Sequence, residues 1–320
     1  NEWDNTVYPC MPGHEIVGRV VKAGASVTKH KMGDIVGVGC MVDSCHTCES
    51  CLQGLENYCE EGFLATYNGN VRTPTQKNLT YGGYSETIVV REDFVLRIPA
   101  GMNHAAASPL MCAGVTTYSP LRHWKVGVGT KVGVVGLGGL GHMAIKLATA
   151  MGAEVSAITT SPDKAMNAKK LGAKHVILSE DADSMDQHER SLDFILSTIP
   201  QPHDVNPYMK LLKRDGTLTI VGCIAPLTEE LDLSKMILDR KTLSTSLIGS
   251  ISETQEVLDF CAEHNISCDI KIIAIDTLSE TFAEIENGES DFRYVIDMAT
   301  LKGRKVKEET FVDRVLELVS

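Results

Sequence analysis

From residue 131 onward, short apolar runs alternate regularly with longer segments that carry apolar residues at helical spacing. Met143, Leu147 and Met151 recur every four positions and form one apolar stripe, which is typical of a helix packed on a sheet. Strands are predicted at 131–136, 154–159, 175–178, 192–197, 217–222 and 243–248, and helices at 139–151, 163–171, 204–213 and 232–239. This alternation predicts an α/β fold with a doubly wound parallel sheet covered on both faces.

The chain before this segment has a different pattern. Residues 13–40 and 81–98 contain short β-branched runs separated by Gly, Asp and Lys turns, which favours an antiparallel, barrel-like β domain. Residues 104–122 carry small apolar residues at helical spacing. A chain with two such patterns is long enough for two domains, each with its own core.

The chain after the α/β segment is predicted to return to β structure. A helix is expected at 252–264, followed by a β-rich stretch at 270–298. The final segment, 301–320, begins basic and ends as a candidate amphipathic helix, whose apolar positions are Phe311, Val315, Leu316 and Val319.

Composition narrows the class of protein. Of the 320 residues, 43% are hydrophobic and 22% are charged, as in soluble globular proteins. A net charge of −12 argues against nucleic-acid and anionic-membrane partners, and no apolar run approaches the ~20 residues that span a bilayer. The chain opens without a signal-peptide pattern, and six of its ten cysteines are scattered. We therefore expect the protein to be located in the reducing environment of the cytoplasm.

The other four cysteines are clustered in fifteen residues with the spacing C-x2-C-x2-C-x7-C: Cys45, Cys48, Cys51 and Cys59. Four thiolates this close in sequence can converge in a tetrahedron around Zn²⁺, leaving no open position for substrate. The alternatives are disulfides, which need an oxidising compartment, and an iron–sulfur cluster, whose common spacings differ from these. The spacing therefore favours a structural zinc lobe, and it places the chemistry elsewhere.

A glycine-rich loop lies between the first predicted strand and the first predicted helix of the α/β segment. It is the GxGxxG sequence Gly136, Leu137, Gly138, Gly139, Leu140 and Gly141. In this context Gly136 allows a tight turn, Gly138 allows close approach to a pyrophosphate, and Gly141 allows close packing of helix and sheet. The helix N-terminus would also attract the phosphates. The alternative is a merely flexible turn.

The residues after the second predicted strand favour NADP(H) over NAD(H). NAD-binding proteins carry an acid there, which binds the ribose 2′-hydroxyl and would repel a 2′-phosphate. Here Thr159, Thr160, Ser161 and Lys164 offer hydroxyls and a positive charge. The alternative role for Thr160 or Ser161 is capping of the next helix, and Asp163 is expected to turn into that helix.

Three further residues are of types that bind zinc: His14, Glu15 and Cys112. Each has a structural alternative, because His14 could be a hydrogen-bonded core histidine, Glu15 a surface charge and Cys112 a small buried apolar residue. Sequence spacing alone does not join positions so far apart.

The motifs together resemble the zinc-dependent medium-chain alcohol dehydrogenases, and most closely their cinnamyl alcohol dehydrogenase-like branch. The matching segments run in the family's order through most of the chain: GHEIVGRVVKAG (13–24), GDIVGVG (33–39), the cysteine lobe, YGGYSE (81–86), PLMCAGVTTYSPL (109–121), GLGGLGHMAIKLA (136–148) and 159–164. The resemblance implies a Rossmann domain plus a mainly β GroES-like catalytic domain. The domains would be 1–114, catalytic, with the zinc lobe at 40–62; 115–265, nucleotide-binding; and 266–320, a return to the catalytic domain.

The resemblance also implies roles for individual residues. His14 and Cys112 would bind a second, catalytic zinc, and Glu15 would be a nearby carboxylate able to bind it transiently. Thr116 would lie near the nicotinamide, and the segment from Ser246 to Ser250, which includes Ile248, would line the cofactor and the interface of a homodimer. The implied activity is reversible hydride transfer between NADP(H) and a primary alcohol or aldehyde, with zinc acting as a Lewis acid on the substrate oxygen.

One departure from the family pattern concerns the N-terminus. The family carries an earlier segment with a Cys-x-His-[Ser/Thr] motif, which supplies another zinc ligand and a proton-relay hydroxyl, and this sequence begins after that position. Cys10 and Cys40 are present, but no motif marks either as a replacement. We expect an incomplete sequence rather than a natural truncation. Two alternatives remain: a zinc-stabilised nucleotide-binding protein without activity, and a quinone- or enone-reductase without catalytic zinc.

Overall fold

The computed structural model describes residues 5–70, 79–287, 293–303 and 315–319. The chain forms two compact units, which are described separately here: the first combines Asn1–Cys112 with Gly249–Ser320, and the second is Ala113–Ile248. The first unit resumes at Gly249, whereas the family resemblance implied a boundary of the nucleotide-binding domain at 265. Within the described residues, no helix has the length and apolar character needed to cross a bilayer.

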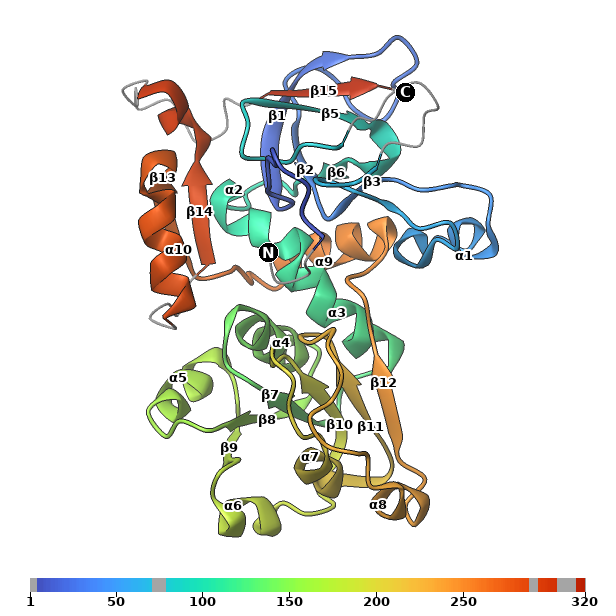
Figure 1. The fold of residues 1–320 in the computed structure, drawn as a ribbon, viewed down its shortest axis with the longest axis vertical. Helices are drawn as coiled ribbons and strands as arrows, with labels where there is room; N and C mark the ends of the chain where they lie inside the picture. Colours follow the sequence, from blue (N-terminus) through green and yellow to red (C-terminus); the bar gives the residue numbers. More distant parts are fainter. Residues whose placement is uncertain (1–4, 71–78, 288–292, 304–314, 320) are drawn as a thin grey trace. The chain divides into compact units, whose positions relative to one another are not determined.

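The second unit is built on a six-stranded parallel sheet (Figure 1). Its strands are β7 (Lys131–Val135), β8 (Glu154–Thr159), β9 (His175–Leu178), β10 (Leu192–Ser197), β11 (Leu212–Ile220) and β12 (Thr242–Thr245). The spatial order is β12-β11-β10-β7-β8-β9, and each neighbouring pair is parallel. Read from β9, this is the 3-2-1-4-5-6 order of the Rossmann fold, whose direction of winding switches between β7 and β10.

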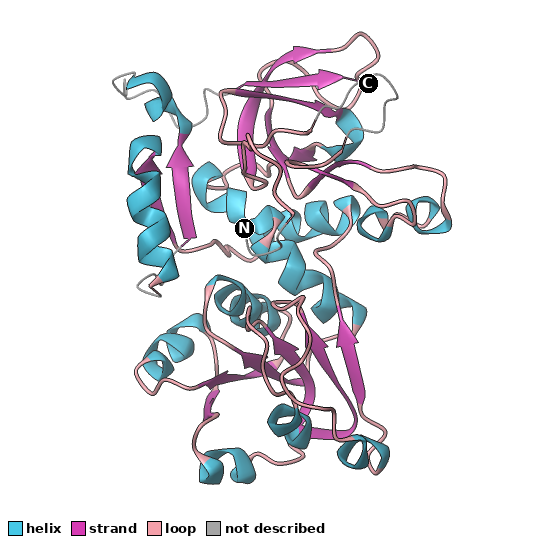
Figure 2. Cartoon of the chain, in the orientation of Figure 1, coloured by secondary structure: helices cyan, strands magenta, loops and turns pink. Residues whose placement is uncertain are grey.

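Helices flank this sheet (Figure 2). They are α3 (Ala113–His123), α4 (Gly139–Ala150), α5 (Lys164–Leu171), α6 (Ala182–Gln187), α7 (Asn206–Leu211) and α8 (Leu233–Ile237). Helix α6 was not predicted, because its sequence ADSMDQ has one large apolar residue and therefore no periodicity. The predicted helix 204–213 ends early at Leu211, since Leu212 is already extended and pairs with Leu192 at the start of β11.

The first unit contains a five-stranded sheet in the order β5-β15-β1-β2-β6. Its strands are β1 (Ile16–Ala23), β2 (Ile35–Val38), β5 (Thr87–Arg91), β6 (Leu96–Arg97) and β15 (Val315–Val319), and a separate pair is formed by β3 (Met41–Asp43) and β4 (Leu64–Ala65). The β1–β2 and β2–β6 pairs are antiparallel, as predicted for this part of the chain.

The prediction of an amphipathic helix at the end of the chain is wrong for residues 315–319, which the structure describes. Residues 315–319 form β15, which lies parallel to β1 on one side and to β5 on the other. Two neighbouring strands pair with its backbone, and valine is a residue type enriched in strands. Phe311, which also contributed to the helix prediction, lies outside the described residues.

The predicted β-rich stretch at 270–298 is only partly correct. Strands β13 (Ile270–Ala274) and β14 (Arg293–Asp297) pair in parallel, but helix α10 (Leu278–Glu286) lies between them in the chain. Its apolar residues Leu278, Phe282 and Ile285 have the i, i+4, i+7 spacing of a helix, a signal that the prediction overlooked.

The segment 104–122, whose small apolar residues have helical spacing, does not form one continuous helix. Helix α2 (His104–Ala107) continues into a 3₁₀ turn, η3 (Ser108–Met111), and α3 begins at Ala113. Cys112 lies at the joint with φ −130° and ψ −70°, outside both helices. The first unit also contains the short helix α1 (Glu49–Leu52) and helix α9 (Ile251–Glu263), which begins with the Ser250–Glu253 capping box.

Candidate functional site

Two groups of metal-binding side chains occur among the described residues. In each group, the nitrogen, sulfur or oxygen atoms that could bind a metal ion lie within 4.8 Å of one another. The first group is the predicted lobe, Cys45, Cys48, Cys51 and Cys59, and the second is His14, Cys40 and Cys112. Both groups lie in the first unit.

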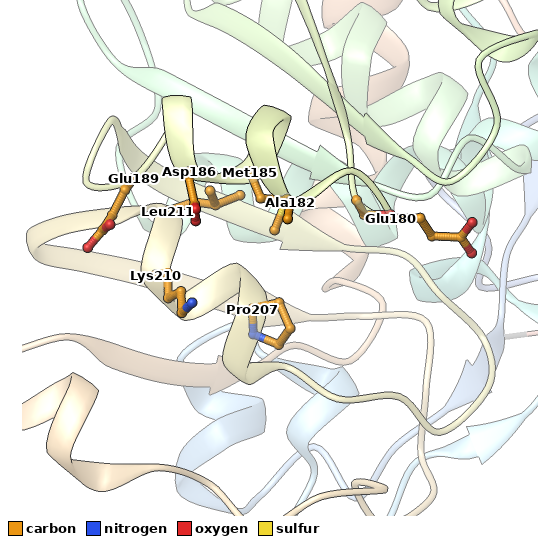
Figure 3. A pocket seen from close by; sticks show the side chains of 9 residues that line it. Glu180, Ala182, Met185, Asp186, Glu189, Pro207, Lys210 and Leu211 are labelled. Carbon is orange, nitrogen blue, oxygen red and sulfur yellow. The ribbon is translucent and has the colours of Figure 1, made fainter.

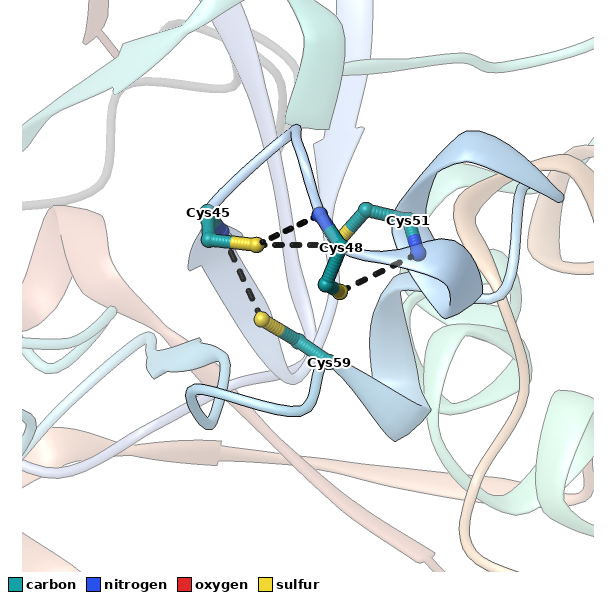
Figure 4. A group of neighbouring side chains, drawn as sticks. All are labelled: Cys45, Cys48, Cys51 and Cys59. Carbon is teal, nitrogen blue, oxygen red and sulfur yellow. Dashed lines mark hydrogen bonds between the residues drawn. The ribbon is translucent and has the colours of Figure 1, made fainter.

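Short local elements bring the lobe cysteines together (Figure 4). Cys48 is the N-cap of α1 and accepts a hydrogen bond from the Cys51 amide, while Cys59 ends the 3₁₀ turn Glu56–Tyr58. The Cys45 and Cys51 sulfurs are 3.8 Å apart. Two ligands of a tetrahedral zinc at Zn–S distances of about 2.3 Å would be separated by about 3.8 Å, so the spacing fits zinc.

Backbone amides point at the lobe sulfurs and prepare them for a cation. The Cys48 amide donates to the Cys45 sulfur at 3.3 Å, and the Cys45 amide donates to the Cys59 sulfur at 3.5 Å. Hydrogen bonds from the Thr47 and Cys48 amides lower the pKa of Cys45 to about 6, whereas burial raises the pKa of Cys51 to about 11. Cys45 is therefore a thiolate at neutral pH, the form that binds metal.

The second group joins side chains that are far apart in the sequence. His14 precedes β1, Cys40 follows β2, and Cys112 lies between η3 and α3. The structure thus brings together His14 and Cys112, which sequence spacing could not join. It also adds Cys40, which the sequence analysis left without a role.

Two glycines let the end of β2 approach the segment that carries Cys112. A Cβ atom on Gly37 would lie 2.3 Å from the Met111 sulfur, and one on Gly39 would lie 3.1 Å from the Met111 carbonyl oxygen. A Cβ at Gly37 would displace the end of the Met111 side chain, and one at Gly39 would press on the Met111 backbone. The Cys40 thiol then reaches the Met111 carbonyl, with a sulfur–oxygen distance of 3.8 Å.

The three side chains polarise one another. A hydrogen bond from the Cys40 thiol, and a further one from His14, hold the pKa of Cys112 well below its usual range. The same hydrogen bond, together with burial, raises the pKa of Cys40. Burial alone would lower the pKa of His14, but its hydrogen bond to Cys112 and the charge of Cys112 outweigh this and raise it. Of the two thiols, Cys112 is therefore the one that loses its proton more readily.

Glu15 pairs with a residue that the sequence analysis did not single out. Its carboxylate forms an ion pair and hydrogen bond with the guanidinium of Arg293, on β14, and it does not belong to the second metal-binding group. Burial raises the pKa of Glu15 to about 7, against the opposing charge of Arg293. Arg293 was missed in the sequence, because no motif surrounds it.

A cavity of about 310 Å³ adjoins the second group within the first unit. His14, Glu15 and Arg293 contribute polar groups, and Tyr67, Tyr84 and Phe282 contribute aromatic surface. The Tyr67 ring lies parallel to the His14 imidazole, with a centroid separation of 5.7 Å and an interplanar angle of 2°. A cavity that combines aromatic and aliphatic walls with several converging polar groups suits a small organic molecule.

The glycine loop of the second unit has the geometry expected of a dinucleotide loop. Gly136 has φ +89°, a conformation that side chains disfavour. A Cβ on Gly141 would lie 2.0 Å from the Gly136 carbonyl oxygen, whereas a Cβ on Gly138 would meet nothing within 4 Å. Helix α4 begins at Gly139 without a side-chain cap, so its first amides are available to an anion.

This contrast predicts different outcomes for two alanine substitutions in one loop. We expect Gly141→Ala to destabilise the protein by roughly 1–3 kcal/mol, because the new methyl group would collide with backbone that cannot move aside. Gly138→Ala should leave the thermal midpoint unchanged, since its φ of −87° suits any residue and its Cβ has open space. Thermal unfolding of the two variants without nucleotide measures the difference, and equal midpoints would contradict the packing role of Gly141.

Thr160 and Ser161, which follow β8, do not cap helix α5, the alternative role considered for them. Asp163 occupies the N-cap position of α5 without a side-chain cap bond, and neither Thr160 nor Ser161 caps that helix. Thr159 is buried at the end of β8, where its hydroxyl accepts from the Ser161 amide at 3.2 Å, while Thr160 and Lys164 are exposed. The hydroxyls of Thr160 and Ser161 and the ammonium group of Lys164 could therefore bind an anion.

The remaining predicted cofactor residues also lie in the second unit. Thr116 is buried in α3. Ser246 follows β12 and donates its amide to the Ile220 carbonyl oxygen at 3.2 Å. Ile248 has φ +40°, an unusual value for a β-branched residue and a sign of local strain.

A separate hollow of about 220 Å³ lies beside α6 and α7 in the second unit (Figure 3). Its charged residues, Glu180, Asp186, Glu189 and Lys210, are all exposed. None of the predicted site residues lines it.

Comparisons with known proteins agree with this geometry. A family model for the alcohol dehydrogenase GroES-like domain matches residues 1–100, and one for zinc-binding dehydrogenases matches 139–263. The chain is 54% identical over 302 residues to the aldehyde reductase YahK of Escherichia coli, covering 94% of this chain and 86% of the relative. It is 47% identical to the NADP-dependent alcohol dehydrogenase C 1 of Mycolicibacterium smegmatis, covering 94% and 85%.

Solved structures give the same result. A cinnamyl alcohol dehydrogenase from Sorghum bicolor matches with a TM-score of 0.88 and 41% identity, covering 97% of this chain and 86% of that chain. The cinnamyl alcohol dehydrogenase from Helicobacter pylori, solved in complex with NADP(H), matches with a TM-score of 0.85 and 42% identity, covering 93% and 84%.

The fold is thus that of an oxidoreductase, with the predicted Rossmann and GroES-like architecture confirmed. The chain belongs to the zinc-type medium-chain alcohol dehydrogenase family, in its cinnamyl alcohol dehydrogenase-like branch.

Proposed function

We propose that this protein is a zinc-dependent alcohol dehydrogenase and aldehyde reductase, which transfers hydride reversibly between NADP(H) and a primary alcohol or aldehyde. The observation that carries the proposal is the convergence of the His14 and Cys112 ligand atoms beside a cavity of about 310 Å³. Relatives described as an aldehyde reductase and as NADP-dependent alcohol dehydrogenases support the same chemistry.

The donor set of each centre fits zinc. Four cysteine sulfurs would hold a structural ion in the lobe, while His14 and Cys112 would hold a catalytic one. Zinc bound there would supply a Lewis acid that polarises the substrate oxygen. The Tyr67 ring lies parallel to the His14 ring, and the lowered pKa of Cys112 favours the thiolate form that a metal requires.

NADP(H) would be held by the second unit and would donate or accept the hydride. The free amides at the start of α4 and the open space at Gly138 suit its pyrophosphate, and Thr160, Ser161 and Lys164 suit its 2′-phosphate. Thr116, Ser246 and Ile248 are the proposed residues around the remainder of the cofactor. A homodimer and a cytoplasmic location stay predictions.

The cavity walls suit a substrate with an apolar body and one reactive oxygen. Tyr67, Tyr84 and Phe282 would pack on the body, as they would on the ring of a cinnamyl-type aldehyde. The Arg293 guanidinium is engaged by the Glu15 carboxylate, so it is not free to bind a substrate carboxylate. A neutral primary alcohol or aldehyde is therefore favoured over a carboxylate.

The direct test is aldehyde-dependent oxidation of NADPH, measured before and after removal of metal. We expect reduction of cinnamaldehyde with NADPH, loss of that activity on chelation, and its return with zinc. Activity that survives complete metal removal would instead indicate a zinc-independent reductase. Tight NADPH binding without turnover in the zinc-loaded protein would indicate a nucleotide-binding protein that is not an enzyme.

Coenzyme preference gives a separate prediction. In Thr160→Asp, a carboxylate follows β8, where it would repel a 2′-phosphate and could bind a ribose hydroxyl. We expect kcat/KM for NADPH to fall at least about tenfold, or about 1.4 kcal/mol, while kcat/KM for NADH does not fall. Thr242→Asp makes the same charge change at another exposed threonine of this unit and should change neither value. An equal loss with both coenzymes would contradict the assignment.

A further inference from the structure

We propose that Cys40 and Cys112 form a peroxide-sensitive thiol pair, in which oxidation joins the two sulfurs in a disulfide bond and withdraws Cys112 from the metal. The observation behind the proposal is that the two sulfurs lie within 4.8 Å of each other. Formation of the bond rests on this geometry alone. Its effect on the metal rests on the proposed function, in which Cys112 is a ligand.

The backbone places the two cysteines at matching points of two touching segments. A Cβ atom on Gly39 would lie 3.1 Å from the Met111 carbonyl oxygen, so the residue before Cys40 lies directly against the residue before Cys112. The Cys40 sulfur approaches the same carbonyl oxygen at 3.8 Å and is also a hydrogen-bond partner of Cys112. A disulfide needs a sulfur–sulfur distance of about 2.05 Å, and rotation about the two Cα–Cβ bonds can bring sulfurs that start this close together to that distance.

Neither cysteine lies inside a regular element. Cys40 follows β2, and Cys112 lies at the joint between η3 and α3. Both side chains are partly exposed, so a small oxidant has access to them. Redox-sensitive cysteines typically combine solvent access with a second cysteine that is close enough to react with the first oxidation product. The pair meets both conditions.

The oxidant is a hydroperoxide, of which hydrogen peroxide is the simplest, and the reaction has two steps. Cys112, as a metal ligand, is a thiolate, the form of cysteine that acts as a nucleophile. Its sulfur attacks one peroxide oxygen, the O–O bond breaks, and the other oxygen takes up a proton from solvent and leaves as water, so that Cys112 becomes a sulfenic acid. The Cys40 sulfur then attacks the Cys112 sulfur: the S–S bond forms, the S–O bond breaks, and the hydroxide leaves with the Cys40 proton as a second water. Two electrons pass from the two sulfurs to the peroxide.

The bond would remove one of the proposed ligands of the catalytic metal, because a thiolate binds metal and a disulfide sulfur does not. In a reducing compartment a disulfide of this kind is transient and is reversed by thiols. The pair would therefore switch the centre off while peroxide is present and restore it afterwards. Cys45 and Cys51 of the lobe, whose sulfurs are 3.8 Å apart, are the competing target, so an experiment must distinguish the two sites.

Peptide mapping of the zinc-loaded protein at rising concentrations of hydrogen peroxide tests this without relying on activity. Free thiols would be blocked, and the protein would be cleaved with trypsin and endoproteinase Asp-N without reduction. This digestion isolates Cys40 in residues 34–42 and Cys112 in residues 98–122, apart from every other cysteine. We expect a linked peptide of these two ranges, which increases in parallel with the loss of the first zinc ion from the chain. Dithiothreitol should release both peptides with free thiols.

Two variants serve as controls. Cys10→Ser removes another partly exposed cysteine of the same unit, one that lies outside both metal-binding groups formed by the described residues, and it should still give the linked peptide. In Cys40→Ser the bond cannot form, and Cys112 should end as a sulfinic or sulfonic acid, which dithiothreitol does not reduce. Should Cys40→Ser fail to fold, the wild-type map decides alone, because the linked peptide is detected without any variant.

The outcomes separate this proposal from the proposed function. Loss of the first zinc ion from the wild type without the linked peptide, or with a bond from Cys112 to Cys10 or only within the lobe, would overturn the thiol pair. A linked peptide that forms while the zinc content stays constant would overturn its effect on the metal. A linked peptide in a zinc-loaded protein that does not reduce aldehydes before treatment would overturn the proposed function and support the thiol pair.

Discussion

Replacing Cys112 with alanine is expected to reduce kcat/KM for aldehyde reduction at least about 10³-fold. The pKa of Cys112 is held well below its usual range, and its loss would remove one of the two proposed ligands of the catalytic metal. Polarisation of the substrate oxygen by a metal contributes several kcal/mol to the transition state, and about 4 kcal/mol corresponds to a factor of 10³. The measurement is NADPH oxidation at varied aldehyde concentration.

The same variant should retain the coenzyme site, because the glycine loop belongs to the other unit. Its dissociation constant for NADPH, measured by fluorescence titration, is therefore expected to be unchanged. Cys223→Ala removes a partly buried thiol outside both metal-binding groups and should keep full activity. Wild-type kcat/KM in Cys112→Ala would reject the proposed catalytic centre.

Loss of the lobe metal is expected to have the largest effect on stability. Cys59→Ser removes a buried ligand from a set of four, and structural zinc sites commonly contribute about 10 kcal/mol or more to folding. If even about 4 kcal/mol of this is lost, the melting temperature should fall by about 10 °C. Calorimetry of wild type and variant, with zinc content determined in parallel, measures both effects.

The loss should spread from the lobe to its neighbours in the first unit. The Glu56 carboxylate, in the 3₁₀ turn that precedes Cys59, accepts a hydrogen bond from the Ile251 amide at the start of α9. Chelation of the wild type is expected to lower its melting temperature in the same way, with a smaller change in Cys59→Ser because its lobe ion is already absent. A melting temperature that is insensitive to both treatments would show that the lobe does not depend on metal.

The second unit could be predicted well because its signals are local. Strand and helix alternate with clear apolar periodicity, and the order of β7, loop and α4 is contained in one short stretch. The glycine pattern itself specified which positions must lack a side chain, and the clash at Gly141 bears this out. Errors occurred where periodicity was weak, as in α6, or where a sparse helical spacing was overlooked, as in α10.

The metal centre of the first unit could be predicted only in part, because its residues meet through tertiary structure. The zinc lobe could be predicted because its four cysteines lie within fifteen residues of sequence. His14 and Cys112 could be joined only through the family resemblance. The proximity of Cys40 could not be predicted at all, because it depends on how closely β2 packs against Met111. Arg293 could not be predicted for the same reason, because its ion pair with Glu15 joins residues that are far apart in the sequence.

The central claim, that this chain binds a second zinc through His14 and Cys112, is tested most directly by zinc content. Protein equilibrated at a buffered zinc concentration would be analysed by elemental mass spectrometry, with Cys112→Ala treated in parallel. We predict about two zinc ions per wild-type chain and about one in the variant, since its lobe is intact. One zinc ion in both proteins would contradict the account.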